Sequence, residues 1–97
     1  MQLHIHRRAE ISLRSLGAVE QKRIHRALAE LAAEPKLPYS SPKFQRLSTG
    51  FSGKKLYVYR ASPRLRLILS LDADGCTIED IVNHDRLDRL FSERRQQ

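Results

Sequence analysis

The 97-residue chain has little cysteine and no long apolar run, and each shortage excludes a class of protein. The single Cys76 allows neither an internal disulfide nor a metal cage built from cysteines, so the chain has no need of an oxidising compartment. The N-terminus, MQLHIHRR, lacks the apolar centre of a secretion signal, and no apolar run approaches the about 20 residues that span a bilayer. We therefore expect a cytoplasmic protein with no membrane partner.

Acidic residues are missing from a long internal segment, residues 35–71. This segment carries eight of the 18 Lys and Arg residues and none of the 11 Asp and Glu residues, so it accounts for the whole net charge of +7. A binding site for a polyanion needs such a concentration of positive charge. A surface that merely keeps the protein soluble would have the same composition, so both interpretations stay open.

Length and composition predict one domain, residues 1–97, with one modest core. A chain of 97 residues buries about 60 to 65% of its unfolded surface, which leaves no room for a second core. Its 40% hydrophobic residues are too many for a disordered chain.

The N-terminal third predicts a short strand followed by two helices. Leu3 and Ile5 alternate with two histidines, which is typical of a strand with one buried face. His4 and His6 share the other face at a spacing that suits a metal, but no third ligand is in view and we expect no metal site. One amphipathic helix then runs from Arg8 to Gly17, which can end it in a left-handed conformation.

The second helix has an apolar stripe over more than two turns and ends at Pro35. The stripe consists of Ile24, Ala27, Leu28, Leu31 and Ala32. We expect the two helices to form a hairpin that covers one face of a small sheet. The proline- and glycine-rich stretch 35–53 is then a loop that holds Lys43 and Arg46 near the next strands.

Residues 54–71, KKLYVYRASPRLRLILSL, predict two strands around a Ser62-Pro63 turn. The leucines at alternate positions from Leu65 to Leu71 should face the core. Arg64 and Arg66 should then project together from the opposite face, where their planar guanidinium groups suit phosphate.

The last third supports two interpretations. Thr77 and Asp80 resemble a helix-capping box, but a helix continued through this region would bury Asp85 or another charged residue. We favour a strand from about Cys76 to Val82 after a tight turn at 72–75, and then a helix over about 85–94.

The order of these elements and the wording of several segments resemble the RelE/ParE superfamily of toxins from bacterial toxin–antitoxin pairs. Three segments carry the resemblance: ISLRSLGAVEQKRIHRALAELAAEP, YRASPRLRLIL and IVNHDRLDRLF. The resemblance implies an α+β fold, with a four-stranded and largely antiparallel sheet, a covering helical hairpin and a short C-terminal helix. It also implies a cognate antitoxin with an acidic or amphipathic segment as partner.

Many members of this family cut messenger RNA, often on the ribosome, without a metal or other cofactor. In them the substrate's own 2′-hydroxyl attacks the neighbouring phosphodiester and leaves a 2′,3′-cyclic phosphate. Matched by position, His84, Arg66 and Arg60 are the catalytic candidates. The expected RNA-binding residues are five further cations of residues 35–71: Lys43, Arg46, Lys54, Lys55 and Arg64.

The chain also departs from the family's pattern. Phe91 stands near the end of the chain where several nucleases have a tyrosine, and Asp85 rather than a basic residue follows His84. Tyr57 or Tyr59 would replace the missing group only if its hydroxyl reaches the basic face. If His84 is not catalytic, it is a surface or helix-capping residue. Two alternatives to a nuclease stay open for the chain: a ParE-like inhibitor of DNA gyrase, and a module that only binds its antitoxin.

Overall fold

The structure is a computed structural model and describes residues 2–33, 44–46, 56–72 and 75–85. These residues form two helices and five strands, which confirms the expected α+β class. In chain order the elements are β1 (Leu3–Ile5), α1 (Arg7–Arg14), α2 (Ala18–Ala33), β2 (Phe44–Arg46), β3 (Leu56–Arg60), β4 (Leu65–Asp72) and β5 (Gly75–Asn83). The expected terminal helix over about 85–94 lies almost wholly outside the described residues.

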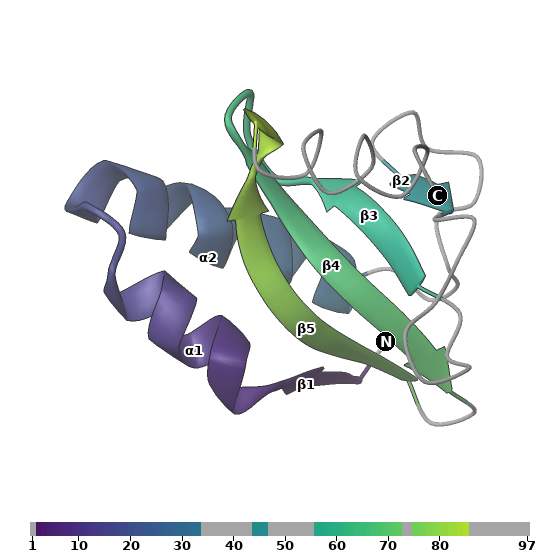
Figure 1. Cartoon of the computed structure of the whole chain (residues 1–97). Coiled ribbons are helices and arrows are strands. Elements are labelled where there is room, and N and C mark those ends of the chain that lie inside the picture. Colours follow the sequence, from purple (N-terminus) through teal and green to yellow (C-terminus); the bar gives the residue numbers. More distant parts are fainter. Residues whose placement is uncertain (1, 34–43, 47–55, 73–74, 86–97) are drawn as a thin grey trace.

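The strands form one sheet in the order β1-β5-β4-β3-β2 (Figure 1). Neighbouring strands are antiparallel except for β1, which pairs in parallel with β5 from Leu3↔Cys76 to Ile5↔Ile78. The largely antiparallel sheet is therefore confirmed. The short edge strand β2 was not expected, because it lies within the stretch 35–53 that was predicted to be a loop.

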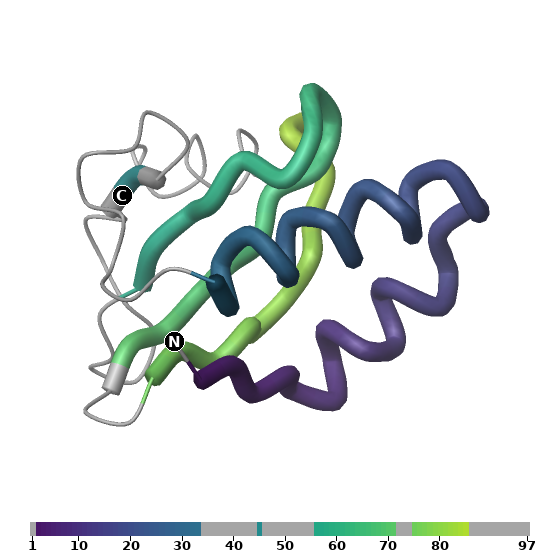
Figure 2. The backbone as a smooth tube through the Cα atoms, turned by 180° about the vertical axis from the view of Figure 1, so that it is seen from behind, coloured from purple at the N-terminus to yellow at the C-terminus, as the bar shows by residue number. Residues whose placement is uncertain are grey.

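Both helices lie on one face of this sheet, and α2 crosses it diagonally (Figure 2). Ile24, Ala27 and Leu31 of α2 are buried against the inward residues of β3, β4 and β5. From the sheet, this core receives Tyr57, Tyr59, Leu65, Leu67, Leu69, Cys76, Ile78 and Ile81. The predicted helical hairpin and the inward-facing leucines are thus confirmed.

The boundaries of α1 differ in detail from the expectation. The side chain of His6 caps its N-terminus, where Nδ1 accepts a hydrogen bond from the backbone N–H of Arg8 (3.0 Å). The helix ends at Arg14, and Ser15 closes it in a right-handed conformation. Gly17 was predicted to end this helix in a left-handed conformation, and that prediction was wrong. Among the described glycines the positive φ belongs to Gly75.

The turn into β5 brings Gly75 against the N-terminal strand. Its φ is +155°, and a Cβ added there would lie 2.2 Å from the backbone oxygen of Gln2. In the same place the N–H of Cys76 donates to that oxygen (3.0 Å). A glycine therefore lets the two chain segments approach closely enough to pair.

Residues 75–83 form a strand, as favoured, and not a helix. β5 pairs with β4 on one side and with β1 on the other, and a register shift next to Ile68 accommodates Glu79. Asp80, the acidic member of the apparent capping box, is buried and its Oδ1 accepts from Ser12 Oγ of α1 (2.9 Å). Pairing with two neighbours thus outweighs a local helical signal.

Candidate nucleic-acid interface

Three of the predicted arginines meet at one end of the sheet, around the turn between β3 and β4. Arg60 and Arg66 are direct partners across β3 and β4, on the face away from the helices. The N–H of His84 donates to the carbonyl oxygen of Arg64 (2.8 Å), so the ladder between β4 and β5 continues for one more step. The fold therefore brings the backbones of Arg60, Arg64, Arg66 and His84 together at this end of the sheet.

The pairing of Arg60 with Arg66 is unfavourable for folding alone, because like charges directly opposite each other in a sheet repel. Departures of this kind from local rules are typical of functional sites. The next cross-strand pair on this face of the sheet, Val58 with Ile68, is apolar. Among the described pairs of β3 and β4, the positive charge on this face thus lies at the end that carries His84.

The guanidinium group of Arg66 is held in place by the turn. Its Nη1 donates to three backbone oxygens there, those of Ser62 (2.7 Å), Leu65 (3.0 Å) and Pro63 (3.4 Å). Ser62 in turn is buried, and its hydroxyl accepts from the N–H of Leu65 (3.0 Å). Arg66 therefore both stabilises the turn and presents a positive charge in a fixed position.

His84 lies at the rim of a shallow hollow of about 190 Å³. Its lining consists of Pro63, Arg64, Asn83, His84 and Asp85. The side chains of Arg64, His84 and Asp85 are exposed, so a ligand in this hollow would meet an imidazole and a guanidinium group at once. This arrangement suits proton transfer beside a bound phosphate.

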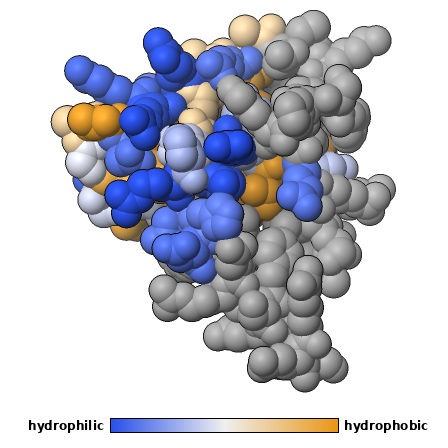
Figure 3. All heavy atoms as spheres, turned by 90° about the horizontal axis from the view of Figure 1, so that it is seen from above, coloured by the Kyte–Doolittle hydropathy of each residue, from blue (hydrophilic) through white to orange (hydrophobic). Residues whose placement is uncertain are grey.

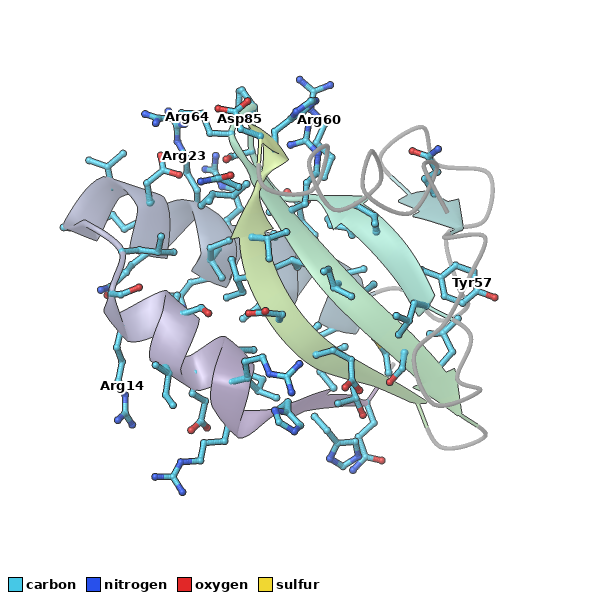
Figure 4. The ribbon with its side chains drawn as sticks, in the orientation of Figure 1. Arg14, Arg23, Tyr57, Arg60, Arg64 and Asp85 are labelled. Carbon is cyan, nitrogen blue, oxygen red and sulfur yellow. The ribbon has the colours of Figure 1, made fainter. Side chains whose placement is uncertain are left out.

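A second hollow, of about 250 Å³, lies on the other side of Pro63, between that turn and α2. It is lined by Arg23, Arg26, Ala27, Glu30, Ala61, Ser62 and Pro63. In the side-chain view Arg23, Arg60 and Arg64 gather at one end of the molecule, whereas Arg14 points away at the opposite end (Figure 4). Most of the described surface is hydrophilic in the view onto this end (Figure 3).

The arginines of α2 were not predicted as site residues. Both Arg23 and Arg26 are exposed, on the side of α2 away from its buried residues. The helical pattern does not show which other element packs beside that face. Contact between α2 and the β3–β4 turn depends on how the helix crosses the sheet.

Neither tyrosine of β3 replaces the missing tyrosine of the family's pattern on the basic face. Tyr57 and Tyr59 belong to the core beneath the helices, opposite the face of Arg60 and Arg66. The hydroxyl of Tyr59 donates to Glu30 Oε2 of α2 (3.3 Å). The condition under which they would take a catalytic role is therefore not met.

The other expected RNA ligands can be placed only in part. Arg46 belongs to the edge strand β2, where its backbone pairs with Tyr57. Lys43, Lys54 and Lys55 lie outside the described residues. In the part of the chain that the structure describes, no three metal-ligating side chains gather, and no helix is long and apolar enough to cross a membrane.

Comparison with known proteins finds similarity at the level of structure. No protein-family model and no curated protein sequence matches the chain. The archaeal RelE–RelB complex from Pyrococcus horikoshii OT3 contains a chain that superimposes with a TM-score of 0.66 at 23% identity, over 88% of this chain and 96% of that one. A chain of the E. coli DinJ–YafQ complex superimposes with a TM-score of 0.53 at 14% identity, over 89% of this chain and 96% of that one. The chain thus has the RelE-like fold.

Proposed function

We propose that this chain, which has the RelE-like fold, is the toxin of a toxin–antitoxin pair and acts as an endoribonuclease on messenger RNA. One observation carries the proposal: three arginines and a histidine converge at one end of a sheet face. Arg60, Arg66 and His84 are the proposed catalytic residues, as predicted from the sequence. Both structural neighbours come from complexes that bear the names of two proteins, which supports a protein partner for this chain as well.

The proposed reaction is a transesterification within the RNA chain. The 2′-oxygen attacks the adjacent phosphorus, the bond from phosphorus to the 5′-oxygen breaks, and the products carry a 2′,3′-cyclic phosphate and a 5′-hydroxyl. One proton leaves the 2′-oxygen and another reaches the departing 5′-oxygen. His84 carries one of these two transfers, because an imidazole can act as a general acid or a general base.

The arginines stabilise the negative charge that develops on the phosphoryl oxygens. Arg66 suits this role because the turn fixes its guanidinium group before substrate arrives, and preorganised donors lower the barrier most effectively. Arg60 lies opposite it on β3 and adds a second cation. Arg64, with Lys43, Arg46, Lys54 and Lys55, binds the flanking phosphates in this proposal.

A histidine exchange tests the catalytic part of the proposal. His84→Gln keeps a hydrogen-bonding side chain but removes the titratable group, so cleavage should fall by about 10² or more while RNA affinity stays unchanged. The matched control is His4→Gln, because His4 is exposed on β1 and away from the basic end. Cleavage is followed by mapping the ends of cellular RNA and by assay in EDTA, where it should persist.

Two results would overturn the assignment. A His84→Gln variant that cleaves at the parental rate would remove His84 from the chemistry. Intact RNA together with inhibited DNA supercoiling would instead favour the gyrase-inhibitor alternative, which the sequence left open.

A further inference from the structure

The hollow between α2 and the β3–β4 turn has the donors for an anion but no large apolar side chain. Arg23 and Arg26 stand one helical turn apart and both line it. The apolar lining consists of Ala27, Ala61 and Pro63 only. A peptide segment usually binds through large apolar anchors, whereas a phosphate chain needs only directed donors and positive charge.

Two carboxylates near this hollow, Glu20 and Glu30, formally balance Arg23 and Arg26, and each already makes a contact within the protein. Glu30 accepts the hydroxyl of Tyr59 (3.3 Å), so one of its oxygens is already engaged. Glu20 lies 3.5 Å from Arg23, where the side chains are 27% and 48% exposed, so this ion pair is weak. Arg26 is exposed beside them and extends the positive surface.

Pro63 links this hollow to the one beside His84, because it lines both. A nucleic-acid strand bound at Arg64 and His84 would therefore reach α2 by crossing Pro63. The same path carries arginines at both ends, Arg64 on one side of the proline and Arg23 on the other (Figure 4).

We infer that Arg23 and Arg26 form a second phosphate-binding site, which holds the RNA backbone beyond the cleavage point. The identity of the ligand rests on the proposed function. The α2 site takes no part in the cleavage reaction. It only increases the length of RNA that the protein binds. It should therefore contribute to long substrates and not to short ones.

Binding of 2′-O-methyl oligonucleotides tests this site apart from catalysis, because they lack the attacking hydroxyl and stay intact. We compare strands of about 4 and about 12 nucleotides, which bracket short and long sites. Replacing both Arg23 and Arg26 by alanine should weaken binding of the long strand by about tenfold and leave the short strand unchanged. Each lost phosphate contact should also reduce the salt slope by about 0.7.

Arg14→Ala is the matched control, because it removes the same side chain from an exposed position at the opposite end of the molecule (Figure 4). A complementary variant, Glu20→Gln, removes the carboxylate that pairs with Arg23. It should tighten binding of the long strand by about two- to threefold, an effect that damage to the fold would not produce.

Each outcome decides a different part. If the double variant binds the long strand like Arg14→Ala, or the parent binds neither strand, the α2 site is wrong. If the double variant instead loses affinity only for an acidic peptide, the hollow belongs to a protein partner and the inference is overturned. A parent that binds the long strand through α2 but leaves cellular RNA intact would support this site while contradicting the nuclease.

Discussion

At the scale of single residues, Arg66 contacts the β3–β4 turn and also has a proposed role in cleavage. Its Nη1 donates to three oxygens of the turn, so Arg66→Ala should lower the free energy of unfolding by about 1 to 2 kcal/mol as well as abolish cleavage. Its neighbour Arg60 is exposed, and Arg60→Ala should change stability by no more than about 0.5 kcal/mol. Urea unfolding and cleavage assays on both variants measure the two effects.

The comparison also has a contrary outcome. If Arg66→Ala unfolds at the parental urea concentration, the hydrogen bonds to the turn do not stabilise it. If Arg60→Ala is less stable than Arg66→Ala, then Arg60 and not Arg66 is the residue that stabilises the turn.

Gly75 is the residue whose replacement should most disturb the backbone. In Gly75→Ala the new Cβ would lie 2.2 Å from the oxygen of Gln2, and φ is in a region that alanine rarely adopts. The loss of stability should reach about 2 kcal/mol or more, seen as a lower melting temperature. Gly17→Ala is the control, because nothing lies within 4 Å of its added Cβ. Equal melting temperatures for the two variants would refute the close approach of β1.

Much of the basic face could be predicted from residues alone. Strict alternation with leucines predicts Arg64 and Arg66 on the outer face, and a positive segment without acids makes that face a candidate site. The alternation of side chains within a strand does not determine the register between strands. Only the structure therefore shows that Arg66 pairs with Arg60 and not with a tyrosine. The alternation also does not predict that the Arg66 side chain folds back onto the β3–β4 turn.

At the scale of elements, a part-buried hydrogen bond links α1 to β5. Asp80 Oδ1 accepts from Ser12 Oγ (2.9 Å) and from the N–H of Ile81 (2.8 Å). Asp80→Ala should therefore destabilise the fold by about 2 kcal/mol, because it leaves buried donors without an acceptor, and Ser12→Ala by about 1 kcal/mol. A double-mutant cycle by urea unfolding should give a coupling of at least about 0.5 kcal/mol. Strict additivity would show that the two side chains act independently.

The number and type of long elements followed from sequence pattern, whereas the edges of the sheet did not. The helical stripe from Ile24 to Leu31 and the alternation of β4 each repeat often enough to outweigh local noise. β2 has three residues, too few for any period. The parallel direction of β1 depends on where the helical hairpin returns the chain, which no local signal records.

At the scale of the whole molecule, the net charge of +7 should govern encounters with the acidic antitoxin segment that the proposed function implies. Exposed charges attract an oppositely charged partner over a distance that salt shortens, so raising the ionic strength should slow association more than it speeds dissociation. Stopped-flow measurement should find the association rate constant at least about tenfold lower at high salt. An association rate indifferent to salt would point to a contact made through apolar surface instead.

The parallel pairing of β1 with β5 also affects the order in which the strands of the sheet can pair during synthesis. β1 can complete its hydrogen bonds only after residues 76–78 exist, so a nascent chain can make most of its helices and β3 before its first strand has a partner. Contacts between such distant positions raise the contact order and slow folding relative to a helical bundle of equal length. A chain assembled in this way would complete its sheet only late in synthesis, after both helices and β3 have been made.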